Sequence, residues 1–321
     1  MKYRTLGSTG LTVSEIGLGA WAIGGHARLG QREIGWGRTD DATSLAALRA
    51  CLDLGINFID TADAYGAGHS EELIGQAFAA QRDQVVIETK GGNRTLGGEW
   101  IKDFSSAWIT QAIEDSLRRL RTDYIDIYLL HTPRPDIGDF GYRPEDYEPL
   151  EQAKAAGKIR HYGISIGPPS DGLRMIESGR GEVMQVVYNM LEREPEAALF
   201  AAAREHRIGV VARVPLASGF LTGKFSADVT FPPDDHRSTL SRAQIAERVA
   251  AVERLRFLER GGRTLAQAAL QFALADEAVS VIIPGAKTPR QLAENARASD
   301  LPPLTPDELR RVREAVPWPS A

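Results

Sequence analysis

The 321-residue sequence predicts an α/β fold, a closed (β/α)8 barrel of the TIM type, and three observations carry this prediction. Short apolar strands alternate with amphipathic helices along the chain, an alternation that is typical of a parallel sheet. The strands are rich in Val and Ile and almost continuously apolar, as strands buried on both faces are. Eight such units fit in about 300 residues, the usual size of a barrel, whereas an open doubly wound sheet usually stops at about five or six strands.

The expected elements follow one another in a regular order. A hairpin over residues 3–13, with Ser8-Thr9-Gly10 as its turn, is expected to plug the bottom of the barrel. The helix over 40–55 ends at Gly55, and a capped helix follows Thr305 near the end of the chain. No linker interrupts the pattern, so we expect one domain over residues 1–321. The strands are expected at 14–20, 57–60, 85–90, 124–131, 159–165, 183–189, 208–215 and 279–284, and the helices between and after them at 40–55, 70–80, 106–120, 145–157, 170–179, 194–206, within 241–260, 264–276 and 288–299.

Composition excludes several classes of protein. The 38 basic and 43 acidic residues give a net charge of −5 without a basic block, so nucleic acid is not expected as a partner. No apolar run reaches the roughly 20 residues of a membrane-spanning helix, and the first residues lack the apolar core of a secretory signal. The single cysteine, Cys51, forbids an intramolecular disulfide. We therefore expect a cytoplasmic protein, and we favour a monomer while leaving the oligomeric state open.

Two motifs resemble cofactor sites but do not have the required context, and no motif resembles a metal site. Gly17-Leu-Gly19-Ala-Trp21-Ala22 matches a dinucleotide fingerprint, yet Gly24-Gly25 and a polar loop follow where a helix should begin. The run from Gly219 to Lys224 is one residue too short for a Walker loop, although a Gly- and Lys-containing loop at a barrel mouth can hold phosphate. The histidines show no zinc-ligand spacing, so no metal site is expected.

Polar residues at the ends of three consecutive strands indicate the reaction centre. Asp60, Lys90 and His131 end the second, third and fourth strands, and Tyr65 follows Asp60 in the loop. The ends of barrel strands meet at one rim, which is where barrel enzymes hold their catalytic groups. A lysine beside a phenol lowers the pKa of the phenol, and an aspartate keeps the lysine charged. The four residues therefore predict a tyrosine acid, tuned toward neutral pH, that protonates a carbonyl oxygen while a hydride reaches the carbon.

The same residues resemble the aldo-keto reductase family, in particular a bacterial-type member. The resemblance is carried by Gly55-Ile-Asn-Phe-Ile-Asp-Thr-Ala-Asp-Ala-Tyr-Gly66 with Glu71 and Gly75, by Glu88-Thr-Lys90, Leu129-Leu-His131, Gly157-Lys-Ile-Arg160, Gly163-Ile-Ser165, Ile283-Pro-Gly285, Glu294 and Asn295. It covers residues 3–300 in order. It implies an NADP(H)-dependent carbonyl reductase whose catalytic residues would be Asp60, Tyr65, Lys90 and His131.

The resemblance also implies a cofactor site at the barrel mouth. Ser165 and Gln185 resemble the pair that fixes the nicotinamide carboxamide, and Lys287 resembles the residue beside the 2′-phosphate. Trp21, Tyr65 and His131 would contact a small carbonyl substrate. The full set of expected cofactor-binding residues is Gly19, Trp21, Ser165, Gln185, Arg213, Pro215, Leu216, Ser218, Gly219, Lys224, Gly285, Lys287, Gln291, Glu294 and Asn295.

Two residues depart from the family pattern, and one other function stays open. Ile166 stands where the family usually has Asn, and Arg213 stands where many members have an aromatic residue that stacks on the nicotinamide. An arginine can itself stack on a ring or bind pyrophosphate. Some relatives serve as regulatory subunits, so a cofactor-binding partner protein is the alternative to an enzyme. The loops at 22–39, 91–105, 132–144 and 225–243 are expected to form the substrate pocket, and they do not indicate one natural substrate.

Overall fold

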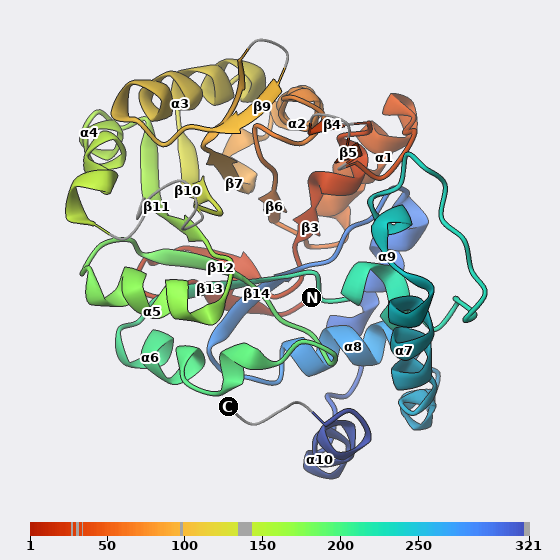
Figure 1. The fold of residues 1–321 in the computed structure, drawn as a ribbon. Coiled ribbons are helices and arrows are strands. Elements are labelled where there is room, and N and C mark those ends of the chain that lie inside the picture. The colour runs from red at the N-terminus through yellow and green to blue at the C-terminus, as the bar shows by residue number, and fades with distance from the viewer. Residues whose placement is uncertain (27, 30–31, 34, 97–98, 134–142, 318–321) are drawn as a thin grey trace.

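The computed structural model describes residues 1–26, 28–29, 32–33, 35–96, 99–133 and 143–317. In this part of the chain a ring of parallel strands lies at the centre and helices surround it, with α10 (Pro306–Ala315) at the periphery (Figure 1). The predicted (β/α)8 barrel is thus confirmed.

Eight strands within the described residues form one parallel sheet in the order β3-β6-β7-β10-β11-β12-β13-β14. Bridges between Ile16 and Ile282 and between Gly19 and Gly285 join the first strand to the last and close the barrel. The strands pair in register, so that their carboxyl ends lie at one mouth. Their bounds are β3 (Leu18–Gly19), β6 (Phe58–Asp60), β7 (Val86–Gly91), β10 (Ile125–His131), β11 (Ile159–Ser165), β12 (Val183–Val187), β13 (Gly209–Arg213) and β14 (Val279–Ile283).

The expected hairpin closes the opposite end of the barrel. It consists of β1 (Tyr3–Thr5) and β2 (Thr12–Ser14), which pair antiparallel. Leu6 and Val13 are fully buried in the cluster that fills the barrel interior. Gly7 has φ of 52°, and a Cβ there would lie 2.2 Å from the backbone nitrogen of Gly209, so only glycine allows this close approach. The plug therefore rests on the beginnings of the strands and leaves their carboxyl ends open for a site.

Helices cover the outer face of the barrel because each buries one apolar face against the strands. Their ends follow ordinary capping rules: the Ser105 side chain accepts from Trp108 N–H at 3.3 Å, and Thr288 accepts from Gln291 N–H at 3.2 Å. No helix of the described chain is both long and apolar enough to span a bilayer. The helices are α1 (Asp41–Asp53), α2 (His69–Phe78), α3 (Ser106–Leu120), α4 (Glu148–Ala155), α5 (Pro169–Glu177), α6 (Leu199–Glu205), α7 (Arg242–Glu253), α8 (Leu265–Ala273) and α9 (Pro289–Ala296).

Two segments that were expected to be loops contain additional hairpins. The first pairs β4 (Arg28–Leu29) with β5 (Arg32–Glu33), and the second pairs β8 (Asn93–Leu96) with β9 (Glu99–Lys102). The sequence signal for the second was Gly97-Gly98 between two short runs, a common hairpin pattern. Elsewhere, Trp36 pairs with Asp235, which brings two of the expected pocket loops together. Residues 134–142, most of a further expected wall, lie outside the described residues.

Candidate active site

The four predicted catalytic residues come together at the mouth of the barrel. Asp60 is the last residue of β6, Lys90 lies near the end of β7, and His131 ends β10. These three strands are neighbours, with Asp60 paired opposite Glu88 and Lys90 opposite Leu129. The register therefore places an acid, an ammonium and an imidazole on adjacent strands, each two residues further along than the one before, at the carboxyl ends of these strands.

Tyr65 reaches this group from the loop after β6. Gly66 follows with φ of 63°, and a Cβ on it would lie 2.0 Å from the carbonyl oxygen of Gly24. Glycine at this position lets the loop pack against the 3-10 helix η1 (Ala20–Ile23), which carries Trp21. The rings of Trp21 and Tyr65 stack with centroids 6.1 Å apart, and the Tyr65 and His131 rings meet edge to face at 5.9 Å. The three residues expected to contact substrate are therefore neighbours.

Lys90 is the electrostatic centre of the site. Its side chain has 0% exposure, and its Nζ forms an ion pair with Asp60 Oδ1. Nζ also donates to the carbonyl oxygen of Thr61 at 2.6 Å and to the Tyr65 hydroxyl at 3.3 Å. Burial alone would lower the pKa of Lys90, but the interactions with Asp60, Tyr65 and Glu88 together outweigh burial and raise the pKa above its usual value. The ammonium therefore stays charged in the interior.

The tuning of Tyr65 differs from the sequence-based prediction. Burial raises the pKa of the Tyr65 phenol, and the Lys90 ammonium lowers it without reversing the effect of burial. The pKa is thus above its ordinary value rather than closer to neutral, which corrects the expectation. The sequence shows the charged neighbour of Tyr65 but does not show the full burial of its ring. At neutral pH Tyr65 is a protonated phenol.

His131 is a neutral imidazole at the same mouth. Burial lowers its pKa well below the usual value, and the positive charges of Lys102, Lys90 and Arg213 lower it further. Its Nδ1 lies 3.0 Å from the side-chain nitrogen of Asn93. His131 is thus suited to donate or accept a hydrogen bond without carrying charge.

Gln185 links this centre to a buried acid that sequence reasoning did not single out as functional. Its Oε1 accepts from Ser165 at 3.5 Å, so the pair expected at the nicotinamide amide is in contact. Its Nε2 donates to Asp60 at 2.8 Å and to Glu88 at 2.5 Å. Glu88 is fully buried, its Oε2 has no hydrogen-bond partner among the described residues, and burial raises its pKa well above the usual value. The signal was its position two residues before Lys90, which places both side chains on one face of the strand.

Arg213 lies at the same mouth with incomplete hydrogen bonding. It ends β13, and its Nη2 donates to the carbonyl oxygen of Ile166 at 3.1 Å. Within the described residues its buried Nε has no hydrogen-bond partner, and burial lowers its pKa. A buried guanidinium with an unused donor fits an anionic or planar polar ligand. The position that departs from the family pattern is therefore still suited to cofactor binding.

The loop after Arg213 has a backbone that few residues adopt. Val214, Ala217 and Ser218 all have positive φ, at 58°, 47° and 55°, and Gly219 follows at 88°. The segment holds its shape through Gly219 N–H and Leu221 N–H, which both donate to the carbonyl oxygen of Leu216. Such strain concentrates at ligand-binding loops. The stretch expected to wrap pyrophosphate, Pro215–Lys224, includes this strained segment.

The expected adenosine end lies where β14 meets α9. Lys287 N–H donates to Gln291 Oε1 at 2.9 Å, and Asn295 Nδ2 lies 3.5 Å from the carbonyl oxygen of Gly285. Lys287 Nζ donates to the carbonyl oxygen of Trp36 at 2.6 Å, a contact that the sequence did not indicate. Glu294 lies on the same helix, and Gly19 pairs with Gly285 across the barrel closure. The expected cofactor-binding residues thus lie on or follow β11, β12, β13, β14 and β3, which are neighbours in the closed barrel.

Comparison with known proteins decides the family. A model of the Aldo/keto reductase family matches residues 15–317. The chain belongs to this family. Aldo-keto reductase YhdN of Bacillus subtilis (strain 168) is 35% identical over 303 residues, covering 91% of this chain and 87% of that protein. The glycerol dehydrogenase AKR11B4 of Gluconobacter oxydans has a similar structure, with a TM-score of 0.84, 31% identity and coverage of 99% and 97%.

Two further relatives bear on cofactor and role. The NADH-specific methylglyoxal reductase of Escherichia coli (strain K12) is 32% identical over 319 residues, with 94% of each chain covered. A probable voltage-gated potassium channel subunit beta of Oryza sativa subsp. japonica is 29% identical over 343 residues, covering 98% of this chain and 97% of that protein. Family membership makes this chain an aldo-keto reductase oxidoreductase that uses a nicotinamide cofactor.

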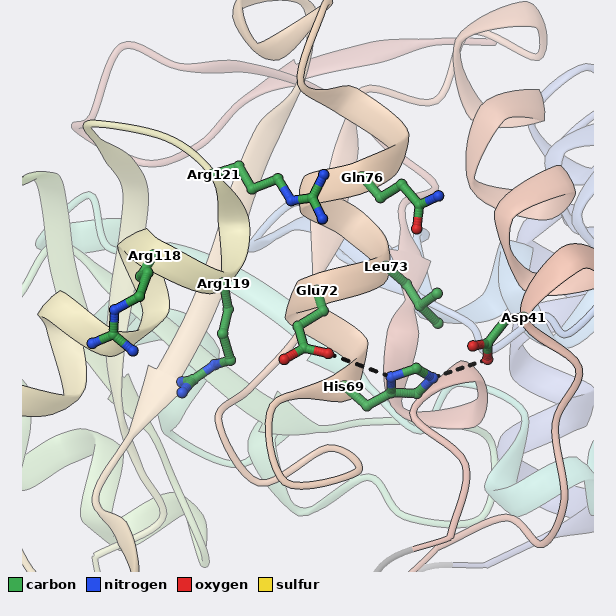
Figure 2. Close-up of a pocket in the computed structure, with 8 residues that line it drawn as sticks. All are labelled: Asp41, His69, Glu72, Leu73, Gln76, Arg118, Arg119 and Arg121. Carbon is green, nitrogen blue, oxygen red and sulfur yellow. Dashed lines mark hydrogen bonds and ion pairs between the residues drawn. The ribbon is translucent and has the colours of Figure 1, made fainter.

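A hollow lies on the outer wall of this aldo-keto reductase, between α1, α2 and the end of α3 (Figure 2). It has a volume of about 450 Å3, and Asp60, Tyr65, Lys90 and His131 are not among the described residues that line it. Its charged groups largely pair with protein groups, as His69 contacts Asp41 and Glu72, and Arg119 contacts Glu71. No cluster of three or more potential metal ligands occurs within the described chain. The barrel mouth is therefore the candidate active site.

Proposed function

We propose that this aldo-keto reductase reduces an aldehyde or ketone to an alcohol, reversibly, with NADPH as the hydride donor and Tyr65 as the general acid. The observation that carries the proposal is the position of Lys90 Nζ between Asp60 and the Tyr65 hydroxyl, 3.3 Å from the phenol oxygen. Because Lys90 donates to that oxygen, the hydrogen of the phenol is left to be donated to a substrate. A proton donor next to a fixed positive charge is what carbonyl reduction needs, since negative charge develops on the oxygen.

The side chains divide the work in a consistent way. The substrate carbonyl would lie against Tyr65 and His131, with Trp21 as a wall. Tyr65 gives its proton to the carbonyl oxygen, and Lys90 stabilises the phenolate that remains. Asp60 keeps Lys90 charged and in place. His131 is neutral and can donate a hydrogen bond to the same oxygen, which positions the carbonyl without adding a charge.

The residues at the mouth fit the nicotinamide cofactor, which supplies the hydride when bound. Ser165 and Gln185 would hold its carboxamide, and Arg213 offers the buried unused donor described above. The strained segment at 214–219 would hold the pyrophosphate. Lys287, just before the N-terminus of α9, would hold the 2′-phosphate, because an ammonium beside a helix N-terminus favours an anion. This arrangement favours NADPH over NADH, although one relative is specific for NADH.

A regulatory subunit is the second candidate, supported by the similarity to a probable channel subunit beta. The complete set of Asp60, Tyr65, Lys90 and His131 favours the enzyme. We also propose that the chain acts as a single domain and a monomer on small carbonyl compounds in the cytoplasm. The one cysteine, Cys51, is buried and its thiol pKa is raised to about 12 by burial, which suits a chain that needs no disulfide.

Turnover with measured stoichiometry tests this proposal. The purified protein is mixed with NADPH or NADH and a panel of aliphatic aldehydes, aromatic aldehydes and sugars, and the alcohol product is quantified beside cofactor oxidation. We expect one alcohol per NADPH oxidised for at least one class, with NADH less effective. Tight NADPH binding without turnover of any class would instead favour the regulatory subunit. No binding of either cofactor would contradict both functions.

A further inference from the structure

Asn93 connects His131 to a carboxylate that the proposed reaction does not use. It is the first residue of β8, in the hairpin that the sequence did not predict. Its side-chain nitrogen lies 3.0 Å from Asp63 Oδ1 and 3.0 Å from His131 Nδ1. Its backbone N–H donates to Asp63 Oδ2 at 3.4 Å, and its carbonyl oxygen accepts from Trp108 Nε1 at 3.2 Å. Asn93 is thus held on three sides.

The direction of these hydrogen bonds follows from which groups can donate. Burial raises the pKa of Asp63 to about 7, so above this pH the carboxylate is ionised and only accepts. The amide of Asn93 must then present its NH2 group, not its oxygen, to Asp63. The same nitrogen carries the second hydrogen, which points to His131 Nδ1. A nitrogen that receives a hydrogen bond has a lone pair and no proton. In a neutral imidazole the proton must then be on Nε2.

The surroundings keep the ring neutral, as this reasoning requires. Burial, and after it the positive charges of Lys102, Lys90 and Arg213, lower the pKa of the imidazole, and Asp63 is the facing group whose negative charge opposes them. Asp63 Oδ1 is 4.0 Å from His131 Nδ1, too far for a hydrogen bond, with the Asn93 amide between them. Lys102 Nζ donates to the backbone oxygen of His131 at 2.5 Å, so this hydrogen bond does not involve a ring nitrogen.

We propose that Asn93, oriented by Asp63, is a positioning residue that fixes His131 as the Nε2–H tautomer. This deepens the proposed function, because an Nε2–H group is a donor for the carbonyl oxygen whereas the other neutral tautomer would present a lone pair to it. Asp63 acts through Asn93, and Asn93 acts through His131. The device differs from a carboxylate–histidine pair, since the amide transmits the orientation without transferring charge to the ring.

Nitrogen chemical shifts of the histidine ring test the tautomer without any turnover. The chain has 6 histidines, so selective 15N-histidine labelling gives few signals, and His131→Gln assigns the one in question. At pH 8 we expect wild-type Nδ1 to be unprotonated and Nε2 to be protonated. Asn93→Asp is combined with Asp63→Asn, because two carboxyl groups at the 3.0 Å separation of residues 63 and 93 would share a proton. The single carboxylate left beside the ring can only accept, so Nδ1 is expected to be protonated in this Asn93→Asp protein. In Asn93→Leu we expect a mixture of tautomers. A protonated Nδ1 in the wild type would overturn the proposal, and so would an unchanged spectrum in Asn93→Asp.

Trp108→Phe is the matched control. It removes the hydrogen bond to the Asn93 carbonyl but leaves the side-chain amide, so the wild-type tautomer is expected to persist. If Trp108→Phe changed the tautomer as much as Asn93→Leu does, a general structural role for the hairpin would replace the proposal. Unchanged signals from the five other histidines would show that each variant is folded.

Kinetics then separate this inference from the proposed function. Loss of one hydrogen-bond donor to a developing oxyanion costs about 10²–10³ in kcat, so Asn93→Asp should lose about 10²-fold in kcat with an unchanged Kd for NADPH. The spectrum of the wild type is readable even if the protein reduces no carbonyl, so failure of the proposed function leaves the tautomer result intact. A change of tautomer in Asn93→Asp with wild-type kcat would overturn the positioning role.

Discussion

Replacing Lys90 by methionine separates the charge of this residue from its bulk. Methionine keeps an unbranched chain of similar length but removes the ammonium and its bonds to Asp60, Thr61 and Tyr65. The side chain of Asp60 is only 3% exposed, so its carboxylate would be left buried with the Gln185 amide as its donor. Removing one partner of a buried ion pair costs about 3–5 kcal/mol, and we expect Lys90→Met to lose this much in free energy of unfolding.

The same substitution should remove most of the activity. Without the ammonium, nothing in the Lys90 position opposes the effect of burial on Tyr65, so the phenol pKa rises further and the phenolate becomes harder to form. We expect kcat to fall by about 10²-fold or more. In the double variant Asp60→Asn/Lys90→Met the unpaired carboxylate is gone, so more than half of the lost stability should return. The lost activity should not return.

Two measurements on the wild type, Lys90→Met and Asp60→Asn/Lys90→Met separate the effect of Lys90 on stability from its effect on activity. Urea unfolding, followed by tryptophan fluorescence, gives the free energy of unfolding of each protein. The pH dependence of kcat gives the apparent pKa of the catalytic acid. A loss below about 1 kcal/mol in Lys90→Met would contradict the importance of the ion pair. Recovery of activity in the double variant would show that Lys90 supports the site only through its structure.

Two further predictions concern the cofactor and the pH dependence of stability. Lys287→Met should weaken NADPH binding about 10–100-fold and leave NADH binding nearly unchanged in fluorescence titrations, because a charge-assisted hydrogen bond to phosphate contributes about 1.5–3 kcal/mol. Equal weakening of the binding of both cofactors would show that Lys287 does not contact the 2′-phosphate. Burial raises the pKa of Asp63 from 3.8 to about 7. Between these two pH values the native state holds a proton that the unfolded chain releases, so the free energy of unfolding falls as the pH rises. Asp63→Asn should remove about 1–2 kcal/mol of this fall between pH 4 and pH 8, less than the full shift because the side chain is 9% exposed. If the free energy of unfolding fell by the same amount between pH 4 and pH 8 in the wild type and in Asp63→Asn, the assignment of this proton to Asp63 would be wrong.

The barrel and the convergence of four residues at its mouth could be predicted from the sequence for physical reasons. Strands buried on both faces stand out in the sequence as short continuous apolar runs, and parallel strands that end in polar residues must bring these together at one rim. The helix over 106–120 and the strand over 159–165 have the predicted bounds. Only the first strand is markedly shorter than expected, because it joins β14 through the bridge at Ile16 rather than through a continuous ladder.

What the sequence did not supply depends on burial and on long-range contacts. The pKa of Tyr65 is decided by how completely the ring is enclosed, which no local pattern reports. The bond between Lys287 and Trp36 joins residues 251 positions apart. Asn93 follows Lys90 by three residues but reaches His131 only because its segment folds into a hairpin. Glu88 was visible as a strand residue, but its role depends on Gln185 on a distant strand.

Tyr65→Phe tests the central claim most directly. The substitution keeps the ring that stacks on Trp21 and removes the hydroxyl that Lys90 contacts. NADPH affinity and turnover of the best substrate are measured on the wild type and the variant in parallel. We expect an almost unchanged Kd for NADPH and a fall in kcat of about 10²–10⁴, the usual contribution of a general acid. Turnover close to that of the wild type, with full cofactor binding, would contradict the assignment of Tyr65 as the proton donor.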